Sequence, residues 1–320
     1  MFYMEVVANT LQILSVAIVL AIGLVFVTAA VLYVIDRSQT EDAVRRNYPV
    51  IGRFRSLFTE LGEFFRQYFF AMDREEMPFN RAQRDWITRA SKAQSNTIAF
   101  GSTRNLQLPG TPIFVNAAFP PLDEQAAKTE PLEIGRYCRT PYIAPSIFNI
   151  SGMSYGALSK PAVLALSKGA AKAGIWMNTG EGGLSPHHLA GGCDIVFQIG
   201  TAKYGVRDAE GNLSDDKLRE VAAIPQVKMF EIKIAQGAKP GKGGILPAAK
   251  VGEEVARIRG IPIGQASISP NRHTDISNNE ELIDAINHIR DVTGKPVGFK
   301  TVMGDFDSLA DFFDRVLKRG

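Results

Sequence analysis

From Ala144 onward, short apolar runs alternate with segments of helical spacing, and this alternation restricts the fold more than any other feature. The apolar runs predict strands at Ile147–Ile150, Ile175–Asn178, Ile195–Ile199, Met229–Ile234 and Pro296–Val302. Strands that are each followed by a helix form parallel βαβ units. No Gly-x-Gly-x-x-Gly motif follows the first run, which argues against a Rossmann domain. The sequence therefore predicts an α/β fold, a (β/α)8 TIM-type barrel that is incomplete in this chain, with about five to six βα units.

Several helix ends are marked in the sequence. A helix is predicted from Ala248 to Arg259, and it stops at Gly260 because glycine adopts the left-handed conformation that ends helices. Ser277 with Glu280 is predicted to form a capping box. Asp307 is predicted to cap the last helix, because aspartate accepts hydrogen bonds from free N–H groups.

A different kind of segment lies near the amino terminus. Ile13 to Ile35 contains no charged residue, and at about 1.5 Å per residue it is long enough to cross a bilayer. The alternatives are a buried core helix and a signal peptide, but a signal peptide has a basic start and a shorter apolar core. Arginines follow the run and none precedes it: Arg37, Arg45, Arg46, Arg53 and Arg55. The positive-inside rule thus predicts a single-pass protein of the inner (cytoplasmic) membrane whose catalytic domain is cytoplasmic.

Four parts follow from these patterns. They are a transmembrane helix at 1–36, a juxtamembrane amphipathic helical segment at 37–95, a wrapping segment at 96–143 and the barrel at 144–320. Apolar residues recur at helical spacing in the second part: Leu57, Phe58, Leu61, Phe65, Tyr68 and Phe69. This stripe is predicted either to lie on the membrane surface or to pack against the catalytic domain. A further helix is expected at Arg81–Ala93 and a strand at Ile113–Val115.

Charge and cysteine content exclude other classes. The net charge is only +3 and no basic run is interleaved with aromatic residues, so nucleic acid is not a predicted partner. Cys138 and Cys193 are the two cysteines, too few for a zinc site or a disulfide framework. His187 and His188 are adjacent rather than spaced as a helical metal pair, and no metal site is predicted.

The stretch from Glu231 to Gly244 joins a strand to a glycine-rich loop. Lys233, Gln236 and Lys239 fall at or just beyond the carboxyl end of that strand, where parallel α/β folds bind ligands. Two cations and an amide suit an anionic ligand, because they donate to carboxylate or phosphate oxygens. The alternative is a mobile surface loop with solvated lysines.

Polar residues also mark the ends of the other predicted strands. Ser151–Ser159 is rich in small residues, on which a flat ring can lie, and Asn178–Gly183 is a glycine turn that contains Glu181. Gln198 and Lys300 belong to two further strand ends. Together with Lys233, they can bond a pyrimidine-like edge and stabilise negative charge on it, which a reduced flavin requires.

These stretches carry a resemblance. Ser151–Ser159, Asn178–Gly183, Glu231–Gly244 and Ser269–Ile276 resemble, in order and roughly in spacing, the FMN-binding synthase domain of glutamate synthase. The chain is most similar to a membrane-tethered FMN-binding glutamate synthase family, which also has an Arg-rich, Tyr-Pro-containing segment like Arg45–Phe70. The likeness covers nearly the whole chain.

The resemblance implies bound FMN, with 2-oxoglutarate over it, and reductive amination to glutamate through 2-iminoglutarate. It implies a substrate set of Lys233, Gln236, Lys239 and Arg259. It implies flavin contacts from Met153, Ser154, Asn178, Thr179, Gln198 and Lys300. Lys233, Glu181 and Lys300 are the implied catalytic residues. His273 lies in a nearby loop, where structural hydrogen bonding is favoured over proton transfer.

The chain also departs from the family pattern. It has no amidotransferase domain with a cysteine nucleophile, so the nitrogen donor is expected to be ammonia, another amine or a separate amidotransferase subunit. The two cysteines do not match the ligands of the parent enzymes' cluster, so an iron–sulfur cluster is not expected in this chain. An electron-donor subunit is a further expected partner. Two alternatives stay open: an FMN-dependent amine or 2-hydroxyacid dehydrogenase that feeds the quinone pool, and a non-catalytic membrane-anchored subunit.

Overall fold

The computed structural model describes residues 2–66, 69, 74–97, 104–115, 117–127, 130–239 and 241–319. Contacts between Cα atoms divide the chain into two compact units, Met1–Ala117 and Ala118–Gly320. Parts of several predictions lie outside the described residues. Among these parts are Tyr68 and Phe70 in the juxtamembrane segment, residues 98–103, 116 and 128–129 in the wrapping segment, Pro240 in the glycine-rich loop, and Gly320 at the end of the predicted barrel.

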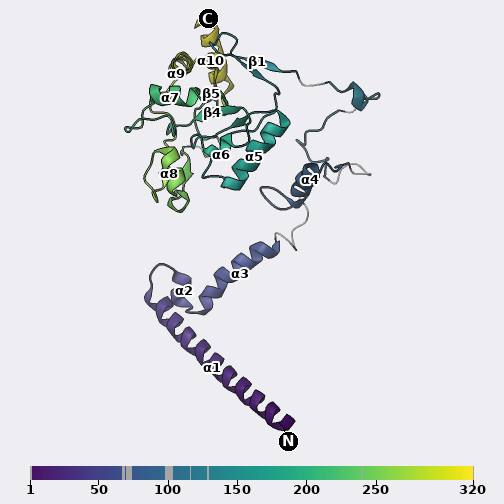
Figure 1. Ribbon diagram of the computed structural model, residues 1–320, viewed down its shortest axis with the longest axis vertical. Coiled ribbons are helices and arrows are strands. Elements are labelled where there is room, and N and C mark those ends of the chain that lie inside the picture. Colours follow the sequence, from purple (N-terminus) through teal and green to yellow (C-terminus); the bar gives the residue numbers. More distant parts are fainter. Residues whose placement is uncertain are drawn as a thin grey trace. The chain divides into compact units, whose positions relative to one another are not determined.

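The unit Met1–Ala117 is helical. Its elements are α1 (Phe2–Ser38), α2 (Ala43–Asn47), α3 (Ile51–Phe65) and α4 (Arg81–Ser91) (Figure 1). Within α1, the part from Asn9 to Ser38 is long and apolar enough to cross a membrane. The predicted apolar amino-terminal helix is confirmed as α1. The helical stripe that begins at Leu57 lies in α3, and the helix predicted at Arg81–Ala93 is α4, whereas α2 was not predicted. The strand predicted at Ile113–Val115 is wrong, and Phe114 there is 99% exposed.

The unit Ala118–Gly320 contains a parallel sheet with the strand order β3-β4-β5-β8. These strands are β3 (Met177–Asn178), β4 (Ile195–Ile199), β5 (Val227–Lys233) and β8 (Val297–Lys300). Two antiparallel pairs accompany it: β1 (Leu132–Ile134) with β2 (Tyr142–Ala144), and β6 (Ile245–Leu246) with β7 (Ser267–Ile268). The predicted mixed α/β fold with a parallel sheet is confirmed.

One predicted strand of this unit is wrong. The run Ile147–Ile150 forms no strand, and Ile150 alone makes an isolated parallel bridge to Met177. The reason lies in Asn149, whose side-chain oxygen accepts from the Trp176 N–H at 3.0 Å and whose amide donates to the Ser146 carbonyl. These side-chain hydrogen bonds take the place of a strand ladder.

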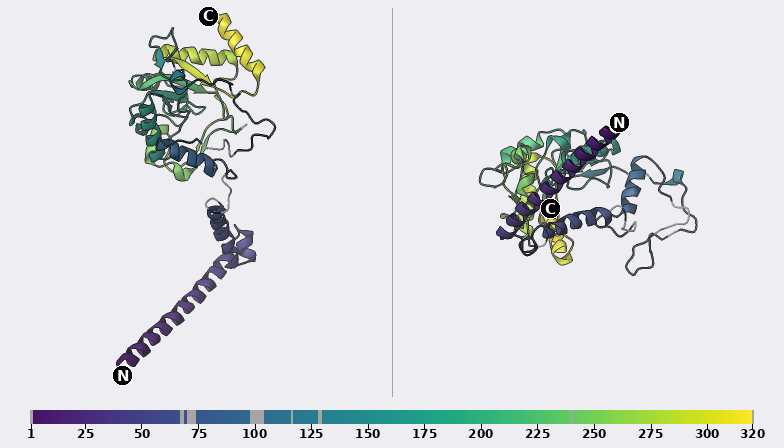
Figure 2. Two further views of the ribbon diagram at one scale, coloured as in Figure 1. Left: turned by 90° about the vertical axis from the view of Figure 1, so that its right-hand side faces the viewer. Right: turned by 90° about the horizontal axis from the view of Figure 1, so that it is seen from below.

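Helices connect and cover the strands (Figure 2). They are α5 (Lys160–Ala173), α6 (Pro186–Leu189), α7 (Asp215–Ala222), α8 (Glu253–Arg259), α9 (Asn279–Thr293) and α10 (Phe306–Arg319). Short 3-10 helices lie at η2 (Asp123–Gln125) and η3 (Ala248–Lys250).

Three predicted helix starts are shifted. The helix predicted from Ala248 is split into η3 and α8, because the extended Gly252 is the N-cap of α8. The N-cap of α9 is Asn278 rather than Ser277. Asp305 rather than Asp307 accepts the free N–H groups at the start of α10. At α9 and α10, a short polar side chain one or two residues away from the predicted one makes the capping hydrogen bond instead. The left-handed Gly260 ends α8 as predicted.

The two faces of the sheet differ in what they contact. Phe197, Phe230 and Ile232 are buried in the large core that the helices cover. Val196 and Met229 point to the other face, where they pack with the β1–β2 pair. Because side chains alternate along a strand, Gln198, Glu231 and Lys233 share that second face. The fold therefore gathers polar groups on the face away from the helices.

The four strands follow one another in chain order, apart from the small β6–β7 pair, and all run in the same direction. Neighbouring strands that are consecutive in sequence are typical of a (β/α)8 barrel, whereas in doubly wound sheets the strand order reverses at a switch point. A closed barrel is not shown by these strands and stays a prediction.

Candidate active site

Four predicted site residues lie at the carboxyl ends of neighbouring parallel strands. Asn178, Lys233 and Lys300 are the last residues of β3, β5 and β8, and Gln198 is the last but one of β4. Lys233 and Lys300 are paired across β5 and β8. Parallel strands end at the same edge of a sheet, so the structure brings these residues to one edge, as the sequence predicted.

Lys233, Gln236 and Glu181 form one hydrogen-bonded cluster. The Lys233 ammonium donates to Glu181 Oε2 at 3.2 Å and to Gln236 Oε1 at 3.0 Å. The Gln236 amide donates to both Glu181 oxygens, at 2.8 and 2.6 Å. The side chains of Lys233 and Glu181 are only 16% and 18% exposed, so the charges interact with little screening. The glycine turn after β3 and the loop after β5 thus meet at a partly buried ion pair.

Glycines leave room for the Glu181 side chain. A Cβ at Gly200 would lie 2.5 Å from Glu181 Cβ, and a Cβ at Gly244 would lie 2.3 Å from Glu181 Oε1. Both distances are too short for real atoms. Gly244, in the glycine-rich loop, is therefore needed for space beside the carboxylate rather than for backbone freedom.

A second cluster joins the ends of β3, β4 and β5. The Asn178 amide donates to Glu231 Oε1 at 2.9 Å, and the Gln198 amide donates to the same oxygen at 2.6 Å. Asn178 Oδ1 accepts from the Gly180 N–H at 2.9 Å. Asn178 and Gln198 are almost fully buried, at 4% and 2% exposure. Glu231 therefore fixes the orientation of both amides.

The loop after Ile150 lies against this second cluster. The Met153 N–H donates to the Asn178 carbonyl at 3.1 Å. A Cβ at Gly152 would lie 3.2 to 3.3 Å from Gly180 Cα and from the Asn178 and Gln198 side chains. Thr179 is fully buried, and its hydroxyl accepts from the Gln198 N–H at 3.0 Å. The structure thus brings Met153, Thr179 and the two amides together.

Arg259 is buried beside the same loop. Its guanidinium donates to Ser154 Oγ at 3.2 Å and to Ser267 Oγ at 3.0 Å, and it lies over the Tyr204 ring. Burial lowers the pKa of Arg259, and the charge of Glu181 opposes this effect. Its Nε is buried with no hydrogen-bond partner among the described residues. Arg259 contacts the predicted flavin residue Ser154 rather than the Lys233–Gln236–Glu181 cluster.

Two predicted lysines are exposed. Lys239 lies on the turn after Gln236, and its backbone N–H donates to the Gln236 carbonyl at 3.1 Å. Lys300 lies at the end of β8, the last strand of the described sheet order. The structure places Lys300 beside Lys233 by strand register but does not bring the Lys239 side chain into either cluster.

His273 supports the backbone of the site. Its Nε2 donates to the Lys233 carbonyl at 2.9 Å, and the ring is only 2% exposed. Burial lowers the pKa of His273, which keeps the ring neutral at neutral pH. This hydrogen bond is the structural role that the sequence favoured.

Two residues of the site were missed from the sequence. Glu231 holds both amides, and its place two residues before Lys233 on one strand was an available signal. His188 is fully buried, its Nδ1 accepts from the Ser185 N–H, and its Nε2 donates to the Met153 carbonyl at 2.8 Å. Only the tertiary structure shows that contact, because His188 lies on α6 whereas Met153 lies on the loop after Ile150.

Other features lie outside these clusters. Among the described residues, no group of three or more His, Cys, Asp or Glu is arranged to hold a metal ion. Burial raises the pKa of the Cys138 and Cys193 thiols. A cavity of about 840 Å³ opens where β8, α9 and α10 meet, and none of the predicted site residues lines it.

Comparison with known proteins identifies the family. A family model described as "Conserved region in glutamate synthase" matches residues 120–312, which is more than half of the chain. The chain belongs to the glutamate synthase family. It is 39% identical to the glutamate synthase large subunit-like protein YerD of Bacillus subtilis over an alignment of 338 positions, which covers 93% of this chain and 64% of YerD.

Other members of the glutamate synthase family match a shorter region. The Archaeal-type glutamate synthase of Thermotoga maritima, whose name specifies NADPH, is 40% identical over 152 residues, 47% of this chain and 27% of that protein. The glutamate synthase large subunit-like protein of Rhizobium meliloti is 34% identical over 167 residues, 52% of this chain and 35% of that protein. The chain thus spans less than two thirds of the length of these relatives. Membership of this family is consistent with an oxidoreductase.

Proposed function

We propose that the chain is an FMN-dependent, glutamate synthase-like oxidoreductase acting on CH–NH2 donors, which forms glutamate from 2-oxoglutarate by reductive amination through 2-iminoglutarate. The observation that carries this proposal is the Lys233–Gln236–Glu181 cluster beside two buried amides at the ends of parallel strands. Membership of the glutamate synthase family supports it. A closed (β/α)8 barrel is proposed on the same grounds and on the consecutive strand order.

The residues beside the two amides fit a flavin. Asn178 and Gln198 present fixed amides that can bond the polar edge of a pyrimidine-like ring. The Gly152 backbone packs closely on Gly180 and on the Asn178 and Gln198 side chains, so a ring bonded to the two amides would lie beside this loop. Met153, Ser154 and Thr179 complete the proposed flavin contacts, and Lys300 would stabilise negative charge on the ring. FMN, when bound, supplies the hydride that reduces the imine.

The substrate proposal rests on the donors of the first cluster. Lys233 and Gln236 both donate to the Glu181 carboxylate. A carboxylate of 2-oxoglutarate offers the same kind of acceptor, so it would compete with Glu181 for these donors. Two fixed donors orient the keto acid, which is an entropic advantage. Lys239 and Arg259 are proposed to assist, Lys239 from the exposed turn after Gln236 and Arg259 through Ser154.

The proposal includes a location and partners. α1 is proposed to cross the inner membrane once, with the catalytic unit in the cytoplasm, because arginines follow the apolar run. Ammonia or another amine is the proposed nitrogen source, with an amidotransferase or electron-donor subunit as a further partner. No iron–sulfur cluster is proposed for this chain.

A spectrum of the purified full-length chain in detergent tests the proposal. We expect a visible flavin band that shifts when 2-oxoglutarate is added, and glutamate formation from 2-oxoglutarate and ammonia with a chemical reductant. Lys233→Met should keep the flavin band and lose the shift. Lys242→Met is the matched control, because Lys242 is an exposed lysine of the same loop, and it should behave as the unaltered chain.

Other outcomes separate the alternatives. Flavin that is reduced by amines or 2-hydroxyacids and reoxidised by quinones, without glutamate formation, would indicate a dehydrogenase. A chain that binds no flavin under any of these conditions would indicate a non-catalytic membrane-anchored subunit and would refute the proposal.

A further inference from the structure

The helix α3 carries a continuous apolar face on its surface. Ile51, Phe54, Leu57, Phe58 and Leu61 recur at intervals of three and four residues, so they lie on one side of the helix. Each of these side chains is between 40% and 72% exposed. An apolar stripe of this size on a single helix marks a contact surface rather than a solvated one.

The opposite side of α3 is polar. Thr59 and Glu63 are exposed there, one turn apart, and Glu60 lies beside them. Arg53 and Arg55 lie at the two borders between the polar side and the stripe, by the rotation of about 100° per residue. Basic residues that flank an apolar stripe are typical of helices that lie in the plane of a membrane surface, because their long stems reach the headgroups.

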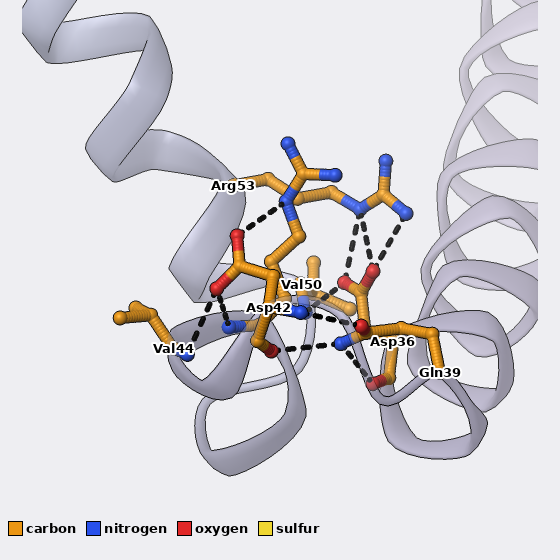
Figure 3. A network of polar contacts seen from close by, with 7 residues as sticks. Asp36, Gln39, Asp42, Val44, Val50 and Arg53 are labelled. Atoms are coloured by element: carbon orange, nitrogen blue, oxygen red, sulfur yellow. Dashed lines mark hydrogen bonds and ion pairs between the residues drawn. The ribbon is translucent and has the colours of Figure 1, made fainter.

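A polar network fixes where α3 begins relative to α1 (Figure 3). Asp36, near the end of α1, is 1% exposed, and its carboxylate accepts from the Val50 N–H at 2.9 Å. The Arg53 guanidinium donates to the same carboxylate at 2.6 to 3.0 Å. Gln39 and Asp42 close the turn by hydrogen bonds at 2.8 and 2.9 Å. The first turn of α3 is therefore held against the last turn of α1.

This network places the stripe at the membrane boundary. Asp36 is the first charged residue after the apolar run, so it marks the end of the segment that spans the bilayer. α3 runs across the direction of α1 rather than continuing it, as Figure 1 and the left view of Figure 2 show. A helix that starts at this level and runs across the spanning helix lies along the surface.

We propose that α3 lies in the surface of the bilayer, with the stripe of Ile51, Phe54, Leu57, Phe58 and Leu61 inserted among the lipid headgroups and upper acyl chains. The exposed guanidiniums of Arg46 and Arg55 face anionic headgroups and strengthen the contact. The Asp36–Arg53 pair holds α3 in this orientation. The inference rests on the proposal that α1 spans the membrane.

Fluorescence quenching in lipid nanodiscs tests the inference on the full chain. An environment-sensitive fluorescent amino acid is placed singly at Leu57 and Leu61 on the stripe, and at Thr59 and Glu63 as matched positions on the polar side. Doxyl-labelled lipid should quench the stripe positions at least about twofold more than the polar positions. Quenching should be weaker in phosphatidylcholine nanodiscs than in those that contain phosphatidylglycerol.

Each other result overturns a stated part of the inference. Stripe positions that are shielded from both doxyl lipid and aqueous iodide would show that protein covers the stripe. Four positions equally open to iodide would show a solvated helix. Equal quenching in both lipids would remove the contribution assigned to the arginines. Extraction with alkaline carbonate separates the failure of α1 as a spanning helix from the failure of the inference about α3. Release of the chain from membranes refutes the spanning role of α1, whereas retention without quenching at the stripe positions refutes only the placement of α3.

Discussion

Removing the Lys233 charge should destabilise the unit Ala118–Gly320 by a predictable amount. The Lys233 ammonium lies 3.2 Å from the Glu181 carboxylate, and at an effective dielectric constant of about 20 two unit charges at that distance attract by roughly 5 kcal/mol. Lys233→Met loses this attraction and leaves the partly buried Glu181 carboxylate without its cation. The Gln236 amide still donates to both Glu181 oxygens, which offsets part of the loss. We expect a decrease in unfolding free energy of about 2 to 3 kcal/mol at neutral pH.

A second substitution shows whether the effect comes from the ion pair. In the Lys233→Met, Glu181→Gln double variant no buried charge is left unpaired, so part of the stability should return. The coupling between the two substitutions should be at least about 1 kcal/mol. Lys300→Met is the matched control: Lys300 is the register partner of Lys233 but is exposed, and its loss should cost less than about 0.5 kcal/mol.

The assay is thermal unfolding of the full-length chain in detergent, followed by tryptophan fluorescence. The chain has two tryptophans, Trp86 and Trp176, and a Trp86→Phe background leaves only the signal of the partly buried Trp176 in the unit Ala118–Gly320. A loss of 2 to 3 kcal/mol should lower the midpoint by roughly 5 to 10 °C for a unit of this size. A midpoint unchanged by Lys233→Met, or no recovery in the double variant, would refute the assigned ion pair.

Three further outcomes are expected. Glu231→Ala leaves two buried amides without their acceptor, so it should lower stability by about 2 to 4 kcal/mol and weaken FMN binding in a fluorescence titration; unchanged flavin affinity would contradict the assigned role. Gly244→Ala places a Cβ against the Glu181 carboxylate, so the 2-oxoglutarate-induced spectral shift should be lost while the flavin band stays. The Tyr155 hydroxyl holds the pKa of the Glu254 carboxyl below its usual value, so this contact stabilises the fold above the unfolded pKa of about 4.3 and the contribution is lost as pH falls through the folded pKa. Tyr155→Phe should therefore show a shallower decrease in midpoint than the unaltered chain between about pH 5 and about pH 3, and equal slopes would contradict it.

The local pattern of the sequence determined the four strands of the parallel sheet in the unit Ala118–Gly320 and the residues at their ends. The strand at Ile195–Ile199 and the helix end at Gly260 were correct because apolar runs, caps and left-handed glycines act over a few residues. The polar strand ends were also correct, because parallel strands that follow one another in the chain end at one edge. Length and composition alone were enough to predict the apolar helix α1.

Tertiary structure decided the rest, because it depends on groups that are distant in sequence. The Asn149 side chain accepts from the Trp176 backbone, so within the apolar run Ile147–Ile150 only Ile150 pairs with β3. His188 holds the carbonyl of Met153, thirty-five positions away, which no local pattern indicates. Glu181 meets Lys233 across two loops because both glycine-rich turns reach the same strand edge and leave room for its side chain. Local propensity sets which segments form helices and strands, whereas the partners of buried polar groups are set only when those segments pack.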